Sequence, residues 1–111
     1  MTWPAAATIH SLIEIPPDHP SFAGHFPKFP VLPGAVLLDE ALQAIHRTRG
    51  IDLERWQITS VKFLDAVHPG DALRLEHAAT GTGSIRFTVR AAGGVVATGS
   101  LSSAHPPAAV A

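Results

Sequence analysis

The chain has 111 residues, of which 46 % are hydrophobic and 15 % charged, and its formal net charge is -1 at pH 7. A chain of this length folds as one domain, residues 1–111, and one so apolar often completes the burial of its surface by forming oligomers. The small net charge argues against nucleic acid as the main partner, because no basic block could bind phosphates.

The sequence contains no cysteine, which excludes thiol nucleophiles, disulfides and thiolate metal sites and fits a reducing compartment. The first eight residues, MTWPAAAT, have neither a basic region nor a long apolar core, so we expect no signal peptide. No apolar run approaches the roughly 20 residues that are needed to span a bilayer. We therefore expect a soluble cytoplasmic protein with no membrane partner.

A strand is predicted over residues 7–15, where isoleucines alternate along one face, and the prolines that begin at Pro16 end it. Residues 21–33 are predicted to form an irregular loop. Its prolines recur at every third position, at Pro27, Pro30 and Pro33. Because each proline fixes φ and biases the preceding residue towards extended geometry, this loop should hold one shape at a low entropic cost.

A helix is predicted from just after Pro33 and Gly34 to about Arg49. Four apolar residues at helical spacing mark its core side: Leu38, Ala41, Leu42 and Ile45. Arginines near the carboxyl end are favoured by the helix dipole, and Gly50 is a natural terminator.

Four strands are predicted after the helix, over residues 59–67, 72–79, 85–91 and 95–102, with turns at residues 69–71, 81–83 and 93–94. Residues 103–111 are expected to be a disordered tail. The predicted fold class is α+β: one strand, one long helix and a four-strand antiparallel meander. A curved sheet wrapped around the helix is the simplest way to cover its apolar stripe.

His25 lies in the loop that leads into the helix, where an imidazole that titrates near neutral pH can serve as a general base. The alternative is a histidine that only hydrogen-bonds a loop carbonyl. Asp39 and Gln43 are four residues apart and share one helix face. Desolvation beside Leu37 and Leu38 would favour a protonated acid at Asp39, whereas the alternative is a solvated helix face.

Gly34 contributes a third group. Backbone N–H groups at a helix amino terminus are unpaired, and a glycine lets a substrate oxygen approach them closely. Such donors can polarise a thioester carbonyl and stabilise the enolate that forms when the α-proton leaves. The alternative is a Pro-Gly turn that only starts the helix. A base, an acid and an N–H donor together describe β-elimination of water from a 3-hydroxyacyl thioester.

The run from Gly24 to Gln43 resembles the motif of the β-hydroxyacyl-(acyl carrier protein) dehydratases, which adopt the hotdog fold. The matching residues are Gly24-His25-Phe26-Pro27, Pro30-Val31-Leu32-Pro33-Gly34, Asp39 and Gln43. Residues 61–63 and 67–71 resemble a later strand and turn of the same family. The short chain is similar to compact members from aryl-polyene and polyketide-type clusters.

The resemblance implies that His25 is the base at C2, that Asp39 handles the hydroxyl at C3, and that the Gly34 N–H binds the thioester carbonyl. It also implies that Gln43 orients Asp39. The remaining substrate-binding candidates are Phe26, Pro30 and Val31.

The resemblance implies a homodimer, with the histidine and the acid of each site coming from different subunits. A higher oligomer and a heterodimer with another hotdog subunit are further options. No metal and no separate cofactor are expected, because the substrate arrives on the phosphopantetheine of an acidic acyl carrier protein. Candidates for guiding that carrier are Lys28, Arg47, Arg49 and Arg55.

The match departs from the family at the acid, where Asp39 replaces Glu, as in the branch that also isomerises the double bond. Glu40 follows directly, so a shift in helix phase would exchange the two roles. Three other readings stay open. They are a hotdog thioesterase that needs no histidine loop, a non-catalytic acyl-binding subunit, and a metal site built from Asp18, His19 and His25.

Overall fold

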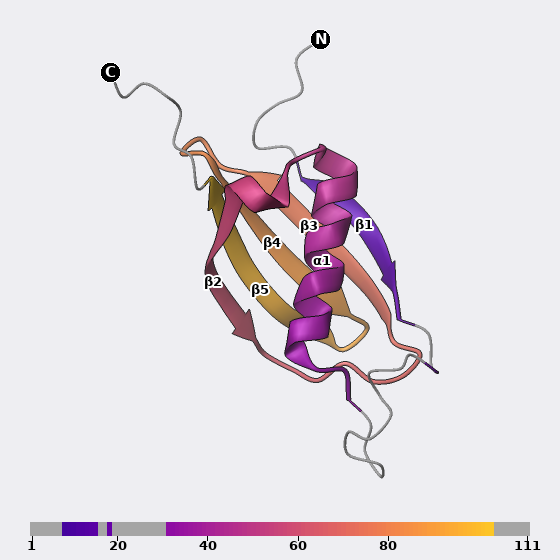
Figure 1. The fold of residues 1–111 in the computed structure, drawn as a ribbon. Coiled ribbons are helices and arrows are strands. Elements are labelled where there is room, and N and C mark those ends of the chain that lie inside the picture. The colour runs from indigo at the N-terminus through magenta and orange to yellow at the C-terminus, as the bar shows by residue number, and fades with distance from the viewer. Residues whose placement is uncertain (1–7, 16–17, 19–30, 104–111) are drawn as a thin grey trace, which may run out of the picture.

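The computed structural model describes residues 8–15, residue 18 and residues 31–103. One long helix lies against one face of a five-stranded antiparallel sheet (Figure 1). The elements are β1 (Ile9–Glu14), α1 (Gly34–Arg49), a short 3-10 helix η2 (Leu53–Arg55), β2 (Trp56–Phe63), β3 (Ala72–Ala79), β4 (Ser84–Ala91) and β5 (Gly94–Ser103). Within the described part of the chain, no helix is long and apolar enough to cross a bilayer.

The strands lie in the order β1-β3-β4-β5-β2, which corrects the predicted meander. Strands β3, β4 and β5 do follow one another as antiparallel neighbours, but β2 pairs with β5 and β1 pairs with β3. The loop of residues 64–71 is longer than the roughly 2–5 residues usual in a hairpin. The loop runs past the amino-terminal end of α1 and joins the edge strand β2 to β3, which lies next to the opposite edge strand β1 (Figure 1).

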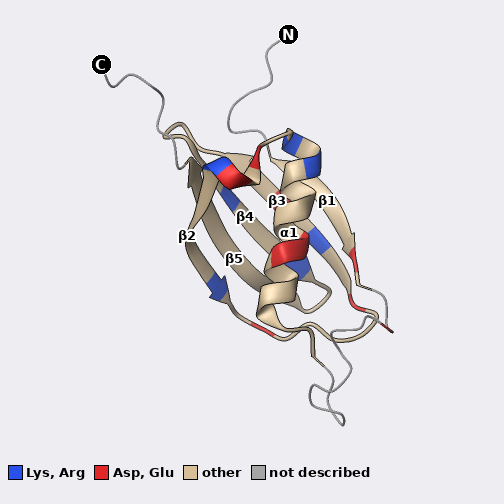
Figure 2. Cartoon of the chain, viewed as in Figure 1, with Lys and Arg blue, Asp and Glu red and all other residues tan. Residues whose placement is uncertain are grey.

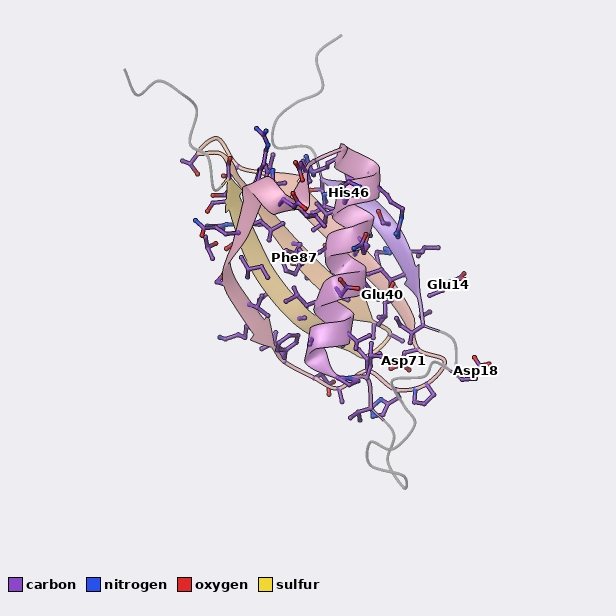
Figure 3. All side chains as sticks on the ribbon, in the orientation of Figure 1. Glu14, Asp18, Glu40, His46, Asp71 and Phe87 are labelled. Atoms are coloured by element: carbon purple, nitrogen blue, oxygen red, sulfur yellow. The ribbon has the colours of Figure 1, made fainter. Side chains whose placement is uncertain are left out.

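The inward faces of the central strands agree with the predicted period of two. Leu73, Leu75 and His77 on β3 are buried, as are Ile85, Phe87 and Val89 on β4. Phe87, labelled in Figure 3, belongs to the face of the sheet that α1 covers. The alternation of β3 and β4 thus places the core between the sheet and the helix.

The buried stripe of α1 differs from the predicted one. It consists of Leu37, Ala41, Ala44 and Ile45, whereas Leu38 and Leu42 are only half-buried at its edge. Ala41 is completely buried, and a small side chain on the contact line lets a helix lie close to a sheet. The contact line therefore follows the alanines, and the two leucines flank it.

Several predicted boundaries moved by a few residues. Strand β2 begins three residues earlier than predicted and ends at Phe63, and Ser103 still belongs to β5. The helix ends as predicted, because Gly50 has φ 66° and its N–H donates to the His46 carbonyl at 2.8 Å. The predicted tail beyond Ser103 lies outside the described residues.

Candidate active site

Within residues 31–103, the amino-terminal end of α1 has two backbone N–H groups without an acceptor. The Pro33 carbonyl accepts from the N–H groups of Val36 at 3.0 Å and Leu37 at 3.1 Å. Among the described residues, the N–H groups of Gly34 and Ala35 have no acceptor. Free N–H groups at the positive end of the helix dipole favour an oxygen that carries or develops negative charge. The predicted donor role of Gly34 therefore has a suitable local structure.

The loop of residues 64–71 holds this end of the helix in place. Leu32, just before the helix, donates its N–H to the carbonyl of Val67 at 2.8 Å, and both side chains are buried. A turn follows, in which His68 N–H donates to Asp71 Oδ2 at 2.8 Å and Gly70 has φ 82°. A proline followed by a glycine with positive φ is the pattern of a type II turn, so the predicted turn is confirmed. Asp71 lies near this end of α1 (Figure 3).

Asp39 points away from the core of its own chain. It follows Leu37 by two residues, which is about 200° around a helix, so it lies opposite the buried stripe. Asp39 is exposed, as are Ala35 and Gln43, and we call this side the outer side of α1. Figure 2 shows the acidic patch of α1 away from the sheet. The expectation that neighbouring residues of the same chain desolvate Asp39 is therefore wrong.

The predicted partner of Asp39 does not contact it. No hydrogen bond joins Asp39 to Gln43 among the described residues, although both side chains lie on the outer side of α1. Glu40 is half-buried on a flank of the helix, and its side chain is labelled in Figure 3. Asp39 is exposed, Glu40 is half-buried about 100° further around α1, and Gln43 is a helix-surface neighbour of both acids.

Of the other predicted site residues, only Val31 is described, and it is half-buried beside Leu32. His25, Phe26 and Pro30 lie outside the described residues. For the alternative metal site, His19 is also outside them. Among the residues that the structure does describe, no three potential ligands come together to hold a metal ion.

Phe63 is a neighbour of Gly34 to which the sequence analysis gave no role. A Cβ built on Gly34 would lie 3.0 Å from Cζ of the Phe63 ring and 3.1 Å from each Cε. Gly34 opens α1 and Phe63 ends the edge strand β2, so only the tertiary fold brings them together. The sequence signal that was available is an aromatic residue just before the loop of residues 64–71.

A polar cluster at the other end of α1 is separate from these groups. His77 is 1 % exposed, accepts a hydrogen bond from Arg49 Nε at Nδ1 (2.6 Å), and has Nε2 3.0 Å from the Thr48 hydroxyl. Because that hydroxyl donates to the Ala44 carbonyl at 2.8 Å, Nε2 carries the hydrogen of a neutral ring. Burial, together with the charges of Arg49 and His10, lowers the pKa of His77 to about 4.

Known proteins resemble this chain in sequence and in fold. A family model described as "ApeI-like: ApeI dehydratase" matches residues 4–100. The 3-hydroxyacyl-[acyl-carrier-protein] dehydratase FabZ of Cupriavidus taiwanensis is 34 % identical over 80 residues, which cover 64 % of this chain and 54 % of that protein. The FabZ of Chlamydia caviae is 37 % identical over 67 residues, which cover 52 % of this chain and 44 % of that protein. The chain thus spans about half the length of the curated relatives it matches.

A solved structure, the dehydratase heterocomplex ApeI:P from Xenorhabdus doucetiae, superposes with a TM-score of 0.70 at 23 % identity. The superposition covers 91 % of this chain and 90 % of the other. Together with the antiparallel sheet around one helix, this likeness confirms the predicted hotdog fold.

Proposed function

This chain belongs to the ApeI-like dehydratase family, and from that premise we propose that it removes water from a 3-hydroxyacyl thioester to give the trans-2-enoyl thioester. The observation that carries the proposal is the arrangement of α1. Free N–H groups of Gly34 and Ala35 begin the helix, and Asp39 stands just over one turn further along on the outer side. A thioester carbonyl bound at the N–H groups of Gly34 and Ala35 would direct the β-carbon of its acyl group towards the Asp39 carboxyl.

Each group has one role in the proposed elimination. His25 takes the proton from C2 while negative charge develops on the thioester oxygen, which the N–H of Gly34 stabilises. The Asp39 carboxyl gives its proton to the hydroxyl on C3. The C3–O bond then breaks, water leaves, and the C2–H electron pair becomes the double bond between C2 and C3. Gln43, on the same side of α1, is proposed to orient the Asp39 carboxyl once substrate is bound.

We propose that a second subunit covers the outer side of α1. In the single chain this side is exposed, and the edge strand β2 carries exposed apolar side chains along and just beyond its length, with Ile58 44 % and Leu64 53 % exposed. An unpaired edge strand with such side chains favours association with another chain. A homodimer would supply the desolvation that Asp39 lacks and bring the His25 of the other subunit to it. The ApeI:P heterocomplex makes a second hotdog subunit the alternative partner.

We propose that the acyl group is delivered by an acyl carrier protein, which the FabZ relatives carry in their name, 3-hydroxyacyl-[acyl-carrier-protein] dehydratase. The pathway would be fatty-acid or polyene-type synthesis. A direct check is to incubate the purified protein with 3-hydroxyacyl thioesters of varied length and aromatic content and to follow loss of water by mass spectrometry. Release of free thiol without an enoyl product would instead identify a thioesterase.

Substitutions at the three polar groups test the assigned roles. We expect His25→Ala and Asp39→Asn to lower the elimination rate by about 10²-fold or more each, since each removes a proton-transfer group. The matched control is Glu40→Gln, which alters the neighbouring, half-buried acid about 100° further around α1 and should retain most of the activity. An active Asp39→Asn with an inactive Glu40→Gln would move the acid to Glu40. Full activity in His25→Ala would overturn the dehydratase assignment.

A further inference from the structure

The Phe63 ring lies so close to Gly34 that a Cβ at position 34 would make an unusually tight contact with it. The distances of 3.0 and 3.1 Å from a Cβ on Gly34 involve Cζ and both Cε atoms, so the tip of the ring points at the glycine. Carbon atoms in ordinary contact lie about 3.5–4.0 Å apart. A Cβ at position 34 would therefore require the ring to shift by a few tenths of an ångström.

The sheet fixes the position of the ring. Phe63 pairs with Ala97 of β5, and the next residue, Leu64, donates its N–H to the Val96 carbonyl at 2.8 Å. The backbone on both sides of the ring is thus tied to a central part of the sheet. The side chain itself is 49 % exposed, which is unusual for a large aromatic residue held in this way.

The ring lies next to the free donors at the start of α1. Among the described residues, the N–H groups of Gly34 and Ala35 have no acceptor, so water would reach them in an open site. A hydrocarbon ring beside these donors offers water no hydrogen bond. A hydrogen bond from an N–H to an oxygen that gains negative charge is stronger where water is excluded.

We propose that Phe63 is a positioning residue for the elimination: its ring forms an apolar wall beside the Gly34 donor, excludes water from it and holds the thioester carbonyl against it. This inference rests on the proposed function. The benefit arises as the C2–H bond breaks and charge moves to the carbonyl oxygen, because the bound ground state carries little charge there. Loss of the ring should therefore lower kcat more than it raises KM.

Three variants test the role of the ring with a 3-hydroxyacyl N-acetylcysteamine thioester as substrate. We expect Phe63→Ala to lower kcat by about 10-fold or more with KM within about three-fold, because the donor remains but becomes hydrated. Phe63→Leu keeps an apolar wall and should stay within about three-fold of the wild-type kcat. Leu12→Ala is the control, since Leu12 is an exposed apolar residue on the opposite edge strand, β1, and should leave kcat unchanged.

A thermal-unfolding cycle tests the contact without any turnover. Gly34→Ala should lower the Tm of the wild type, and should lower it less in the Phe63→Ala background, where the ring is absent. Equal losses in the two backgrounds would overturn the inference. So would a normal kcat in Phe63→Ala, or a fall in Leu12→Ala as large as that in Phe63→Ala. A folded wild type without any elimination activity would instead overturn the proposed function.

Discussion

His77 is fully buried in β3 and stays neutral because both of its ring nitrogens are engaged. Arg49 donates to one nitrogen and the other donates to Thr48. Protonation would add a hydrogen at Nδ1, where the Arg49 guanidinium already lies 2.6 Å away. The neutral ring therefore links β3 to the carboxyl-terminal end of α1. Protonation of the ring at acidic pH would weaken this link.

We expect the free energy of unfolding to fall as the pH drops from about 6.5 to about 4. The pKa of His77 is lowered to about 4 in the folded chain, so in this window the unfolded chain binds a proton that the folded chain does not. The loss amounts to about 3 kcal/mol and is complete below the folded pKa. Urea unfolding at several pH values measures it. The variant His77→Gln cannot titrate and should lose this part of the pH dependence; an unchanged slope in that variant would contradict the assignment.

Gly99 is a second position at which a single substitution should change stability, because a Cβ does not fit there. A Cβ there would collide with the ring of Phe87 and would lie 2.8 Å from the Ser60 carbonyl oxygen. We expect Gly99→Ala to destabilise the fold by about 1–3 kcal/mol, because a buried ring and a strand backbone would both have to move. Chemical denaturation measures the change. Gly81→Ala is the control, since nothing lies within 4 Å of its Cβ position; equal losses at the two glycines would refute the steric explanation.

At the scale of elements, the sheet has two edge strands with different surroundings. Leu12 on β1 is 73 % exposed and stands opposite Arg74 of β3. Ile58 near the start of β2 and Leu64 just beyond its end are exposed on the opposite edge, and the end of β2 lies next to the amino-terminal end of α1 (Figure 1). Only the β2 edge adjoins the free donors of Gly34, so an interface there would enclose the candidate site.

We expect Ile58→Lys and Leu64→Lys to raise the dissociation constant of the dimer by about 10-fold or more, because each would bury a charge in an apolar interface. Leu12→Lys is the matched control on the other edge and should leave it unchanged, although Leu12 is the most exposed of the three. Sedimentation or light scattering gives the oligomeric state. Dissociation in Leu12→Lys alone would place the interface at β1 instead.

Local sequence patterns predicted the individual elements well, but they did not predict which elements lie next to one another. The period of two in β3 and β4 and the left-handed Gly50 are local, and both were confirmed. The pairing of β2 with β5 is not local, and the alternating pattern within a strand does not determine which strand it pairs with. The sequence left open whether Asp39 is desolvated or lies on a solvated helix face, because exposure depends on which side of the helix the sheet covers. The approach of Phe63 to Gly34 likewise exists only in the folded molecule.

At the scale of the whole molecule, the central proposal is a site shared between two copies of the chain. If His25 and Asp39 of one site belong to different subunits, a dimer of one His25→Ala chain and one Asp39→Asn chain contains one intact site. Random mixing of the two inactive variants should then restore about one quarter of the wild-type activity. Assay after co-expression or after unfolding and refolding together measures this. Sites built within one subunit would give no recovery.

Helix α1 is held at both of its ends, at the start by the bond from Leu32 to Val67 in the loop of residues 64–71 and at the finish by the bond from Arg49 to His77 of β3. A helix that is hydrogen-bonded at both ends cannot slide along its own axis. The first amides of α1 and Asp39 therefore keep their positions while both hydrogen bonds persist. On gradual heating, the active-site geometry should therefore persist until the fold melts cooperatively. The temperature at which activity is lost should coincide with the calorimetric unfolding transition.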